Sequence, residues 1–176
     1  MNRVTTRSWK VLCWNVRGLN SDARQRSVRE KVTESQCAVV CLQETKLQHI
    51  SPFKLRSFLP GSFQDHVVTP SVGAAGGILV TWDTACVQGH VIDTHRYHVT
   101  LKMSSTSTAN SFMITAVYAP CLHDDRPAFF AAVNNVAADT DTPWIVLGDF
   151  NMYRFAHEKS CGRINWNHME MFNTWI

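Results

Sequence analysis

The sequence predicts an α/β sandwich of four layers, in which two mixed β-sheets are flanked by helices. Runs typical of strands alternate with helical patterns at both ends of the chain, and a series of short β-rich runs fills the middle. The chain has 176 residues and 45% apolar content, which suffices for one domain with a buried core. We expect this domain to occupy residues 9–176, after a disordered segment at residues 1–8.

The first part of the chain is expected to form a strand, a helix and a second strand. Residues 9–15, WKVLCWN, alternate in polarity as a strand does. The segment that follows has cap-type residues at Asn20 and Ser21 and valines four residues apart, which is typical of a helix. Residues 37–45, CAVVCLQET, form a continuous β-branched run, as expected of a strand that is covered on both faces.

The middle of the chain is expected to form antiparallel hairpins. Five β-rich runs follow one another with only short polar or glycine-bearing joints, and the Ser/Thr-rich residues 104–111 are interpreted as a hairpin loop. Together with the strands at the two ends of the chain, these hairpins predict a mixed sheet system. The five runs are FQDHVVTP (63–70), GGILVTWD (76–83), CVQGHVIDT (86–94), YHVTLKM (97–103) and SFMITAVYAP (111–120).

The next helix is expected within residues 123–137. Asp125 is placed to cap it, Pro127 lies in its first turn, and apolar residues recur at three- and four-residue spacing. This helix leads into a strand, PWIVLG, at residues 143–148. The strand is followed directly by an acid, an aromatic residue and an amide.

A last helix is expected within residues 165–176, with Asn167 as its cap and Met169, Phe172 and Ile176 on one face. Neither glycine nor proline follows this pattern, which is still running at Ile176. We interpret this as C-terminal truncation of a longer domain, and we expect exposed apolar area and unpaired strand edges.

Charge, cysteine use and hydropathy limit the possible settings. The net charge of +3 is compatible with a polyanionic partner but decides nothing alone. No apolar run approaches the roughly 20 residues that cross a bilayer, so no membrane partner is expected. No apolar leader precedes the six scattered cysteines, which predicts packed thiols in a reducing compartment, nuclear or cytoplasmic rather than secreted. These cysteines are Cys13, Cys37, Cys41, Cys86, Cys121 and Cys161.

Polar side chains stand at the ends of three expected strands. Asn15 ends the first, Gln43 and Glu44 end the second, and Asp149 and Asn151 follow the strand at 143–148. Each one alone is more often a turn residue that bonds its own backbone. If the three strands lie side by side, however, carboxylates and amides gather at one rim. Carboxylate oxygen is what a hard cation such as Mg²⁺ selects, so the rim predicts a magnesium site.

Four motifs in order carry a family resemblance: WN at 14–15, QE at 43–44, YAP at 118–120 and GDFN at 148–151. With them the chain resembles the endonuclease/exonuclease/phosphatase, or DNase I-like, superfamily from about residue 9 to 176. WNVRGLN, QET, GGILVTW and FNTWI look most like the endonuclease domain of plant LINE-type (non-LTR) retrotransposons. The resemblance implies a Mg²⁺-dependent DNA endonuclease, with Mn²⁺ as a substitute ion, and a reverse-transcriptase domain downstream as a partner.

The resemblance also implies a role for each matching residue. Glu44 would bind the Mg²⁺, and Asn15 beside it would help to fix the metal and the scissile phosphate. Asp149 would orient or deprotonate the attacking water, Asn151 would donate to the phosphoryl oxygens, and Tyr118 would lie near the phosphate. Such hydrolysis needs a cation and preformed donors where negative charge accumulates.

Some of these residues have plainer interpretations. Tyr118 is also compatible with an ordinary strand aromatic, and Gln43 is better explained as a structural neighbour of Glu44 than as a catalyst. Gly148 is expected to let the backbone turn close to a phosphate, and Phe150 to point into the core. A basic helix face, formed by Arg24, Arg26, Arg29 and Lys31, is either solvated or in contact with DNA backbone.

One part of the family pattern has no match. The resemblance calls for a C-terminal Asp-His pair, and QDH at 64–66 comes too early in the order to supply it. We therefore expect these residues to be impaired or inactive as an enzyme. Two alternatives stay open: a non-catalytic transposon remnant or nucleic-acid-binding module, and a hydrolase of the same superfamily with a lipid or nucleotide substrate. The pairs His95/His98 and Cys37/Cys41 have zinc-like spacing but no second pair to complete a site.

Overall fold

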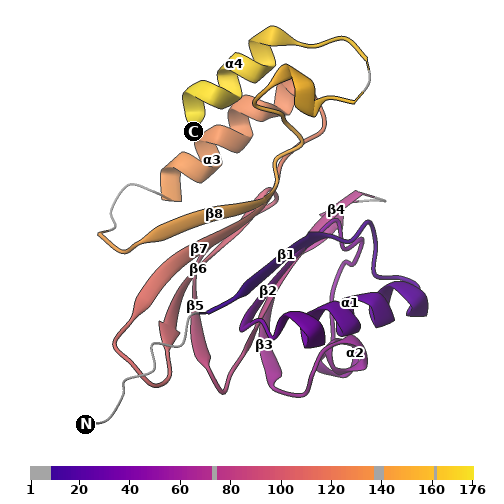
Figure 1. Ribbon diagram of the computed structural model, residues 1–176, viewed down its shortest axis with the longest axis vertical. Helices are drawn as coiled ribbons and strands as arrows, with labels where there is room; N and C mark the ends of the chain where they lie inside the picture. Colours follow the sequence, from indigo (N-terminus) through magenta and orange to yellow (C-terminus); the bar gives the residue numbers. More distant parts are fainter. Residues whose placement is uncertain (1–8, 73–74, 137–140, 161) are drawn as a thin grey trace.

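Two four-stranded β-sheets lie face to face in the computed structural model, with helices on their outer sides (Figure 1). The structure describes residues 9–72, 75–136, 141–160 and 162–176. The expected disordered segment at residues 1–8 lies outside this range. The strand orders are β1-β2-β4-β3 in one sheet and β5-β6-β7-β8 in the other. The predicted sandwich of two mixed sheets between helices is confirmed.

The first sheet combines a parallel pair with two antiparallel ones. β1 and β2 run parallel because a helix connects them, and β4 pairs antiparallel with both β2 and β3. All five residues of β2 are buried, which confirms that this strand is covered on both faces. The strands are β1 (Val11–Asn15), β2 (Val39–Gln43), β3 (Phe63–Val72) and β4 (Ala75–Asp83).

The second sheet has the predicted hairpins followed by one parallel strand. β5, β6 and β7 pair antiparallel in sequence order, and the β6–β7 joint falls in the expected Ser/Thr-rich segment. A helix then returns the chain so that β8 lies parallel to β7. The strands are β5 (Val87–His95), β6 (His98–Ser105), β7 (Ser111–Tyr118) and β8 (Trp144–Asp149).

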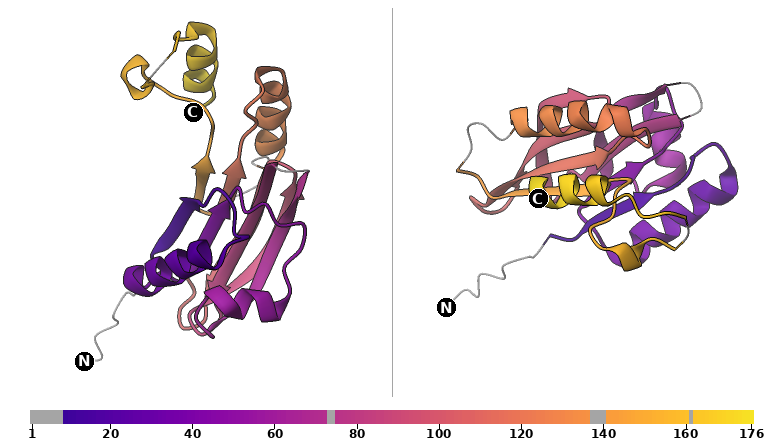
Figure 2. Two further views of the ribbon diagram at one scale, coloured as in Figure 1. Left: turned by 90° about the vertical axis from the view of Figure 1, so that its right-hand side faces the viewer. Right: turned by 90° about the horizontal axis from the view of Figure 1, so that it is seen from above.

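Four α-helices in the described part of the chain form the outer layers. α1 and α2 pack on the outer side of the first sheet, whereas α3 and α4 lie side by side at the β7–β8 end of the second (Figures 1 and 2). The helices are α1 (Asp22–Ser35), α2 (Pro52–Phe58), α3 (Arg126–Val136) and α4 (Trp166–Trp175), with short 3-10 turns η1 (His123–Asp125) and η3 (Ala156–Glu158). No described helix is long and apolar enough to cross a membrane.

The core between the sheets is built from alternate strand residues. Cys41, Val80, Leu101 and Ile114 are fully buried there, each from a different strand. Their neighbours along the chain point to the other face of each sheet, and in the first sheet Val40, Leu42 and Leu79 pack there against residues of α1 and α2. This alternation is the period of two that the strand runs show in the sequence.

The helix caps agree with the sequence at one end of the chain and differ at the other. Ser21 caps α1 as expected, since its hydroxyl accepts a hydrogen bond from Arg24 N at 3.3 Å. The expected cap at Asn167 is wrong. α4 begins two residues earlier, and Asn165 Oδ1 accepts from His168 N at 3.2 Å. Both residues are asparagines, so the local sequence does not distinguish them.

The buried face of α4 is also different from the expected one. Phe172 is buried as predicted, but Ile176 is 61% exposed. Trp175 takes its place, with its ring centroid 5.9 Å from that of Phe129 on α3. The ring of Phe150, which points into this core as expected, lies 5.3 Å from Phe172. The aromatic side chains of α3 and of the segment after β8 therefore set the rotation of α4.

The thiols are only partly packed. Cys37 and Cys41 are buried as expected, and burial raises the pKa of Cys41 well above its ordinary value, so this thiol stays protonated. The expectation is wrong for Cys13 and Cys121, which are exposed. Cys13 lies on β1, an edge strand whose open side leaves it uncovered. Cys161 lies outside the described residues.

Among the described strands, β1 and β8 each pair on one side only. These two edges lie on the same side of the sandwich, because β1 contacts β8 across the gap between the sheets. Ile145 on β8 is 47% exposed there. This is the exposed apolar surface and unpaired edge that the sequence leads us to expect.

Candidate active site

The carboxyl ends of β1, β2 and β8 meet at one end of the sandwich, where the chain brings its predicted site residues together. Asn15 pairs with Gln43 in the first sheet, and Tyr118 pairs with Asp149 in the second. The two sheets are joined directly at this point, because Asn15 Nδ2 donates a hydrogen bond to Asp149 Oδ2 at 2.5 Å. The expected gathering of carboxylates and amides at one rim is thus present.

The backbone turns sharply where these strands end. Five non-glycine residues of the described chain have positive φ, and four of them follow β1, β2 or β8: Arg17, Glu44, Lys46 and Asn151, with φ between 49° and 57°. A non-glycine residue in this region costs on the order of 1 kcal/mol and persists only where its surroundings hold it. Two of the four, Glu44 and Asn151, are residues that the sequence places in the site.

Glu44 is held by its backbone and left accessible at its side chain. Its carbonyl accepts a hydrogen bond from Gly18 N at 2.7 Å, which fixes the residue against the loop after β1. The carboxylate is 21% exposed and forms an ion pair with Lys46 Nζ at 3.3 Å. Because a lysine side chain is flexible, this ion pair leaves the carboxylate free to exchange its partner for a cation.

Asp149 is fixed through both carboxylate oxygens. Oδ2 accepts from Asn15, and Oδ1 accepts from Asn151 N at 2.9 Å. The backbone carbonyl of Asp149 also accepts from Ala119 N at 2.8 Å, which joins the end of β8 to the segment after β7. The carboxylate therefore has one orientation, with its remaining lone pairs toward the rim.

The two amides of the site already use part of their hydrogen-bonding capacity. Asn15 Oδ1 accepts from Arg17 N at 3.1 Å, and Asn151 Nδ2 donates to Ala119 O at 2.7 Å. A side-chain amide has two donors and two acceptor positions. Each therefore keeps one oxygen lone pair or one N–H for a ligand, so the roles expected of them stay predictions that the geometry permits.

Tyr118 interacts electrostatically with both carboxylates of the rim. Burial and the negative charges of Glu44, Cys121 and Asp149 raise the pKa of Tyr118 to about 12. Its hydroxyl is therefore a neutral donor at physiological pH. Tyr118 lies beside Asp149 in the register of β7 and β8, and the charge of Glu44, which follows a strand of the other sheet, acts on the same hydroxyl.

Replacing Glu44 with glutamine is expected to lower the pKa of Tyr118 toward 10.0, because the neutral amide removes one negative charge beside the phenol. Since the folded-state pKa is the higher one, the stabilisation by Tyr118 is complete below about pH 10 and is lost as the pH rises through about 12. NMR titration of ¹³C-labelled tyrosine, assigned with Tyr118→Phe, measures the shift. Glu34→Gln, which makes the same charge change on the exposed side of α1, serves as control. A Tyr118 pKa that is the same in the parent and in Glu44→Gln would contradict the closeness of Glu44 to Tyr118.

The residues at the rim suit a hard cation. Glu44 offers a carboxylate and Asn15 an amide oxygen, which are the oxygen donors that Mg²⁺ takes, with water and substrate phosphate filling its other positions. Among the described residues, no three or more His, Cys, Asp or Glu side chains are grouped so that they could hold a metal ion. A donor set with so few carboxylates matches the sparse protein ligation of Mg²⁺ better than a closed Zn²⁺ site.

The other candidate residues lie elsewhere. Gln43 is buried and donates to Cys41 O at 3.3 Å, as expected of a structural neighbour. Asp65 and His66 pair with the far part of β4, at the opposite end of the sandwich from Gln43. The zinc-like pairs do not converge on a metal: Cys37 and Cys41 belong to different cores, and His98 Nε2 lies 2.8 Å from Asp93 Oδ2.

Sequence reasoning missed one residue that supports the site. Arg126, at the start of α3, is 5% exposed, and its Nη2 donates to Asn151 O at 3.0 Å. This bond holds the residue after β8 in its unusual backbone conformation. An arginine in a first helical turn carries no local signal of burial, so only the packing of α3 reveals it.

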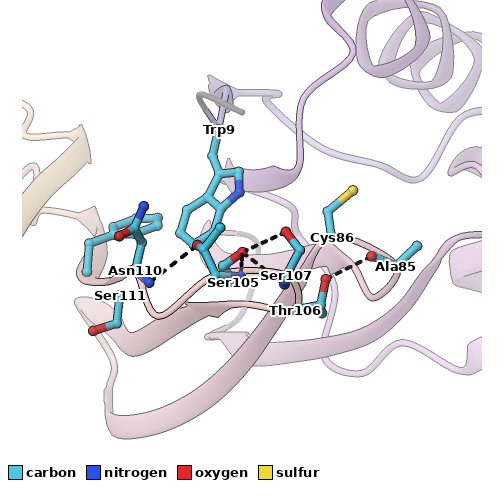
Figure 3. Close-up of a pocket in the computed structure, with 10 residues that line it drawn as sticks. Trp9, Ala85, Cys86, Ser105, Thr106, Ser107, Asn110 and Ser111 are labelled. Atoms are coloured by element: carbon cyan, nitrogen blue, oxygen red, sulfur yellow. Dashed lines mark hydrogen bonds between the residues drawn. The ribbon is translucent and has the colours of Figure 1, made fainter. Parts of the chain in front are cut away.

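A cavity of about 300 Å³ lies at the opposite end of the sandwich, near Trp9 and the β6–β7 loop (Figure 3). Its hydroxyl groups bond within the protein: Ser105 Oγ accepts from Ser107 N at 3.2 Å, and Thr106 Oγ1 donates to Ala85 O at 3.0 Å. The carboxylates of the rim are remote from it, so we do not assign it to the site.

Solved structures share this fold at low sequence identity. The AP endonuclease LMAP from Leishmania major has a TM-score of 0.67 and 15% identity, covering 88% of this chain and 59% of that one. An AP endonuclease from Archaeoglobus fulgidus has 0.61 and 13%, covering 85% and 60%. A mannosyl-6-phosphatase from Bacteroides thetaiotaomicron has 0.63 and 14%, covering 82% and 66%. The chain thus spans less than two thirds of the length of each.

No curated protein sequence matches the chain. A match to a protein family, however, extends over residues 12–164 and includes every residue of the rim described above. The family and its structural neighbours are hydrolytic enzymes. On this match and on the shared sandwich fold, the chain belongs to the Endonuclease/Exonuclease/phosphatase family.

Proposed function

We propose that this protein cleaves phosphodiester bonds of DNA with the help of Mg²⁺, as an endonuclease of the non-LTR retrotransposon type. The observation that carries the proposal is the hydrogen bond from Asn15 to Asp149, which joins the two sheets and sets a fixed carboxylate beside Glu44 and Tyr118. A hydrolase needs such a fixed group to direct water and a separate group to hold a cation.

The division of labour follows from the contacts. Glu44, with the oxygen of Asn15, would hold the ion, and Lys46 would then release the carboxylate. Bound there, the ion supplies positive charge against the negative charge that develops on the phosphoryl oxygens. Asp149, fixed through both oxygens, would orient the attacking water. The neutral hydroxyl of Tyr118 and the second N–H of Asn151 would donate to the phosphoryl group.

Separate observations support the identity of the ion and of the substrate. Divalent metal ions are usual in this family, and oxygen donors favour Mg²⁺ or Mn²⁺ among them. DNA as substrate is supported by the similarity of the motifs to those of LINE-type endonucleases and by the net charge of +3. On the same resemblance we propose a reverse-transcriptase domain as partner. The buried, protonated thiol of Cys41 supports a reducing setting, in the nucleus or cytoplasm.

Glu44→Gln is expected to lower the affinity for Mn²⁺ at least about tenfold, since loss of a supporting contact alone typically costs that much. Mn²⁺ binding to residues 1–176, measured by electron paramagnetic resonance, tests this directly and does not require turnover. Glu34→Gln removes the same charge from an exposed position and should bind as the parent does. Equal Mn²⁺ binding by the parent and Glu44→Gln would refute the metal assignment.

Cleavage is a separate measurement. The histidine that the family resemblance requires has no match in residues 1–176, so we expect little or no Mg²⁺-dependent nicking of supercoiled plasmid by these residues alone. Strong nicking that both Glu44→Ala and Asp149→Ala abolish would support the chemistry and overturn the expected impairment. DNA binding that is steeply salt-dependent and indifferent to Glu44 and Mn²⁺ would favour a non-catalytic module instead.

The structural similarity to a mannosyl-6-phosphatase supports a second substrate class, the phosphomonoesters. Bis-p-nitrophenyl phosphate and p-nitrophenyl phosphate, assayed in parallel with Mn²⁺, separate a phosphodiesterase from a phosphomonoesterase. Faster release from the monoester would favour the alternative of a lipid or nucleotide substrate.

A further inference from the structure

A second polar pocket, of about 460 Å³, lies behind Asn151, between the starts of α3 and α4. We refer to it as the basic pocket. The described residues that line it include three cationic side chains and two histidines and no aspartate or glutamate. Arg126 connects it to the candidate active site, because this residue lines the pocket and donates to Asn151 O at 3.0 Å. The basic side chains are Arg126, Lys159, Arg163, His123 and His168.

Arg126 has a donor in this pocket that no described residue satisfies. The residue is 5% exposed, and its Nε is buried without a hydrogen-bond partner among the described residues. Nδ1 of His168 is in the same situation. A buried guanidinium or imidazole group without a partner is costly, and natural proteins usually satisfy such groups with a ligand or water. The unpaired N–H of Arg126, which lies among other cationic side chains of one pocket, indicates an acceptor that enters from outside.

The remaining groups make the pocket strongly attractive to anions. The rings of His123 and His168 lie 3.8 Å apart. Burial is the main reason that the pKa of His168 lies below its ordinary value; His123 and Arg126 act in the same direction, and Asp124 opposes them. The pocket also lies at the N-termini of α3 and α4, which begin at Arg126 and Trp166. Free N–H groups and the helix dipole favour negative charge at such ends.

One side chain of the rim indicates what kind of anion fits. Trp166 lines the pocket and is 60% exposed. An exposed indole beside a basic pocket is the combination with which single-stranded nucleic acid is bound, since the cationic groups take the phosphate and the aromatic ring stacks on a base. An inorganic anion has no base that could stack on the indole.

We propose that the basic pocket binds a phosphodiester group of a nucleic-acid strand, next to the one that is cut, with the adjacent base stacked on Trp166. The proposal rests on the proposed function, because it assumes that the strand continues from the rim past Asn151. Arg126 then acts on both sides: its Nη2 positions Asn151, and its Nε meets the neighbouring phosphate. Lys159, whose Nζ already reaches Arg163 O at 2.6 Å, and Arg163 close the outer side.

Fluorescence anisotropy with a labelled single-stranded dodecamer tests this in EDTA, where no metal contributes. Lys159→Ala/Arg163→Ala is expected to weaken binding about tenfold and to reduce the salt slope by about 1.4, that is about 0.7 for each lost phosphate contact. Arg24→Ala/Arg26→Ala removes equal charge from the basic face of α1 and should change neither. Arg163→Glu, at an exposed position, repeats the test if the double variant fails to fold.

Trp166→Ala separates a strand from a free anion. It is expected to weaken dodecamer binding about tenfold with an unchanged salt slope, because stacking is lost and the phosphate contacts remain. Binding of inorganic phosphate, measured by calorimetry, should be unaffected by the same change. Tight phosphate binding that the dodecamer does not displace would assign the pocket to a free phosphate and overturn the proposal.

Two further outcomes would also overturn it: equal losses in the α1 and pocket variants, or dodecamer binding that is the same in the parent and in Lys159→Ala/Arg163→Ala. The proposed function is judged separately, by Mn²⁺ binding in Glu44→Gln. In EDTA, Glu44→Gln should bind the dodecamer as the parent does. A loss of Mn²⁺ binding can therefore be distinguished from a loss of dodecamer binding.

Discussion

Gly148→Ala is expected to cost more than about 4 kcal/mol and to prevent stable folding, a loss at the extreme of what single substitutions cause. Gly148 lies in β8 with φ of +146°, a conformation that side chains rarely adopt. A Cβ placed there would come within 2.0 Å of Val117 O on the paired strand β7. Because both atoms belong to backbone that the sheet holds in register, neither can move aside. Urea unfolding followed by circular dichroism measures the loss.

The matched control is Gly61→Ala. A Cβ at Gly61 meets nothing within 4 Å, so we expect its stability to stay within about 0.5 kcal/mol of the parent. Near-equal stability of the two variants would show that β8 does not pack on β7 as described. The structure gives Gly148 a role in close contact between β8 and β7, and the expected approach of its backbone to a phosphate stays a prediction.

Asn15→Asp is expected to destabilise the folded state by about 2 kcal/mol at pH 8 and by much less at pH 4, relative to the parent. The substitution sets a second carboxylate 2.5 Å from Asp149, and two carboxylates at that distance retain one shared proton. The folded-state pKa of the pair therefore rises above its unfolded value. The variant keeps its stability at low pH and loses it as the pH rises through the raised pKa. Urea unfolding at several pH values measures this difference.

The exchange variant Asn15→Asp/Asp149→Asn tests whether contact between the two side chains is the cause. It restores one amide and one carboxylate, so most of the stability at pH 8 should return. A pH-independent loss in Asn15→Asp, or no recovery in the exchange variant, would show that the two sheets are not joined through these residues.

Much of the fold follows from local patterns in the sequence. The alternation in WKVLCWN and the apolar run CAVVCLQET predict β1 and β2, and Ser21 predicts the start of α1. The hairpins of the middle and the helix before β8 are also found where the patterns place them. Strand period, helix period and capping are properties of neighbouring residues, which is why a linear reading detects them.

Other features have no local signal. α2 is short and begins at Pro52 after the cap Ser51, a pattern too brief to separate from a turn. The cap of α4 is Asn165 rather than Asn167, and the helix packs Trp175 rather than Ile176 against the core. These outcomes depend on which aromatic rings of α3 and of the segment after β8 the helix meets. Hydrophobic periodicity predicts that a helix has an apolar face. The boundaries and the rotation of the helix depend on the elements that pack against it.

The sequence by itself determined the fold class and the residues that the strand ends present: Asn15, Glu44, Tyr118, Asp149 and Asn151. Only the tertiary structure decided how they meet, since Asn15 and Asp149 are 134 positions apart and belong to different sheets. The same holds for Gly148 against β7 and for Arg126 beneath Asn151. Chemistry can be predicted from residue types and local order, but distances between sheets, and with them burial and electrostatic coupling, arise only when the layers pack.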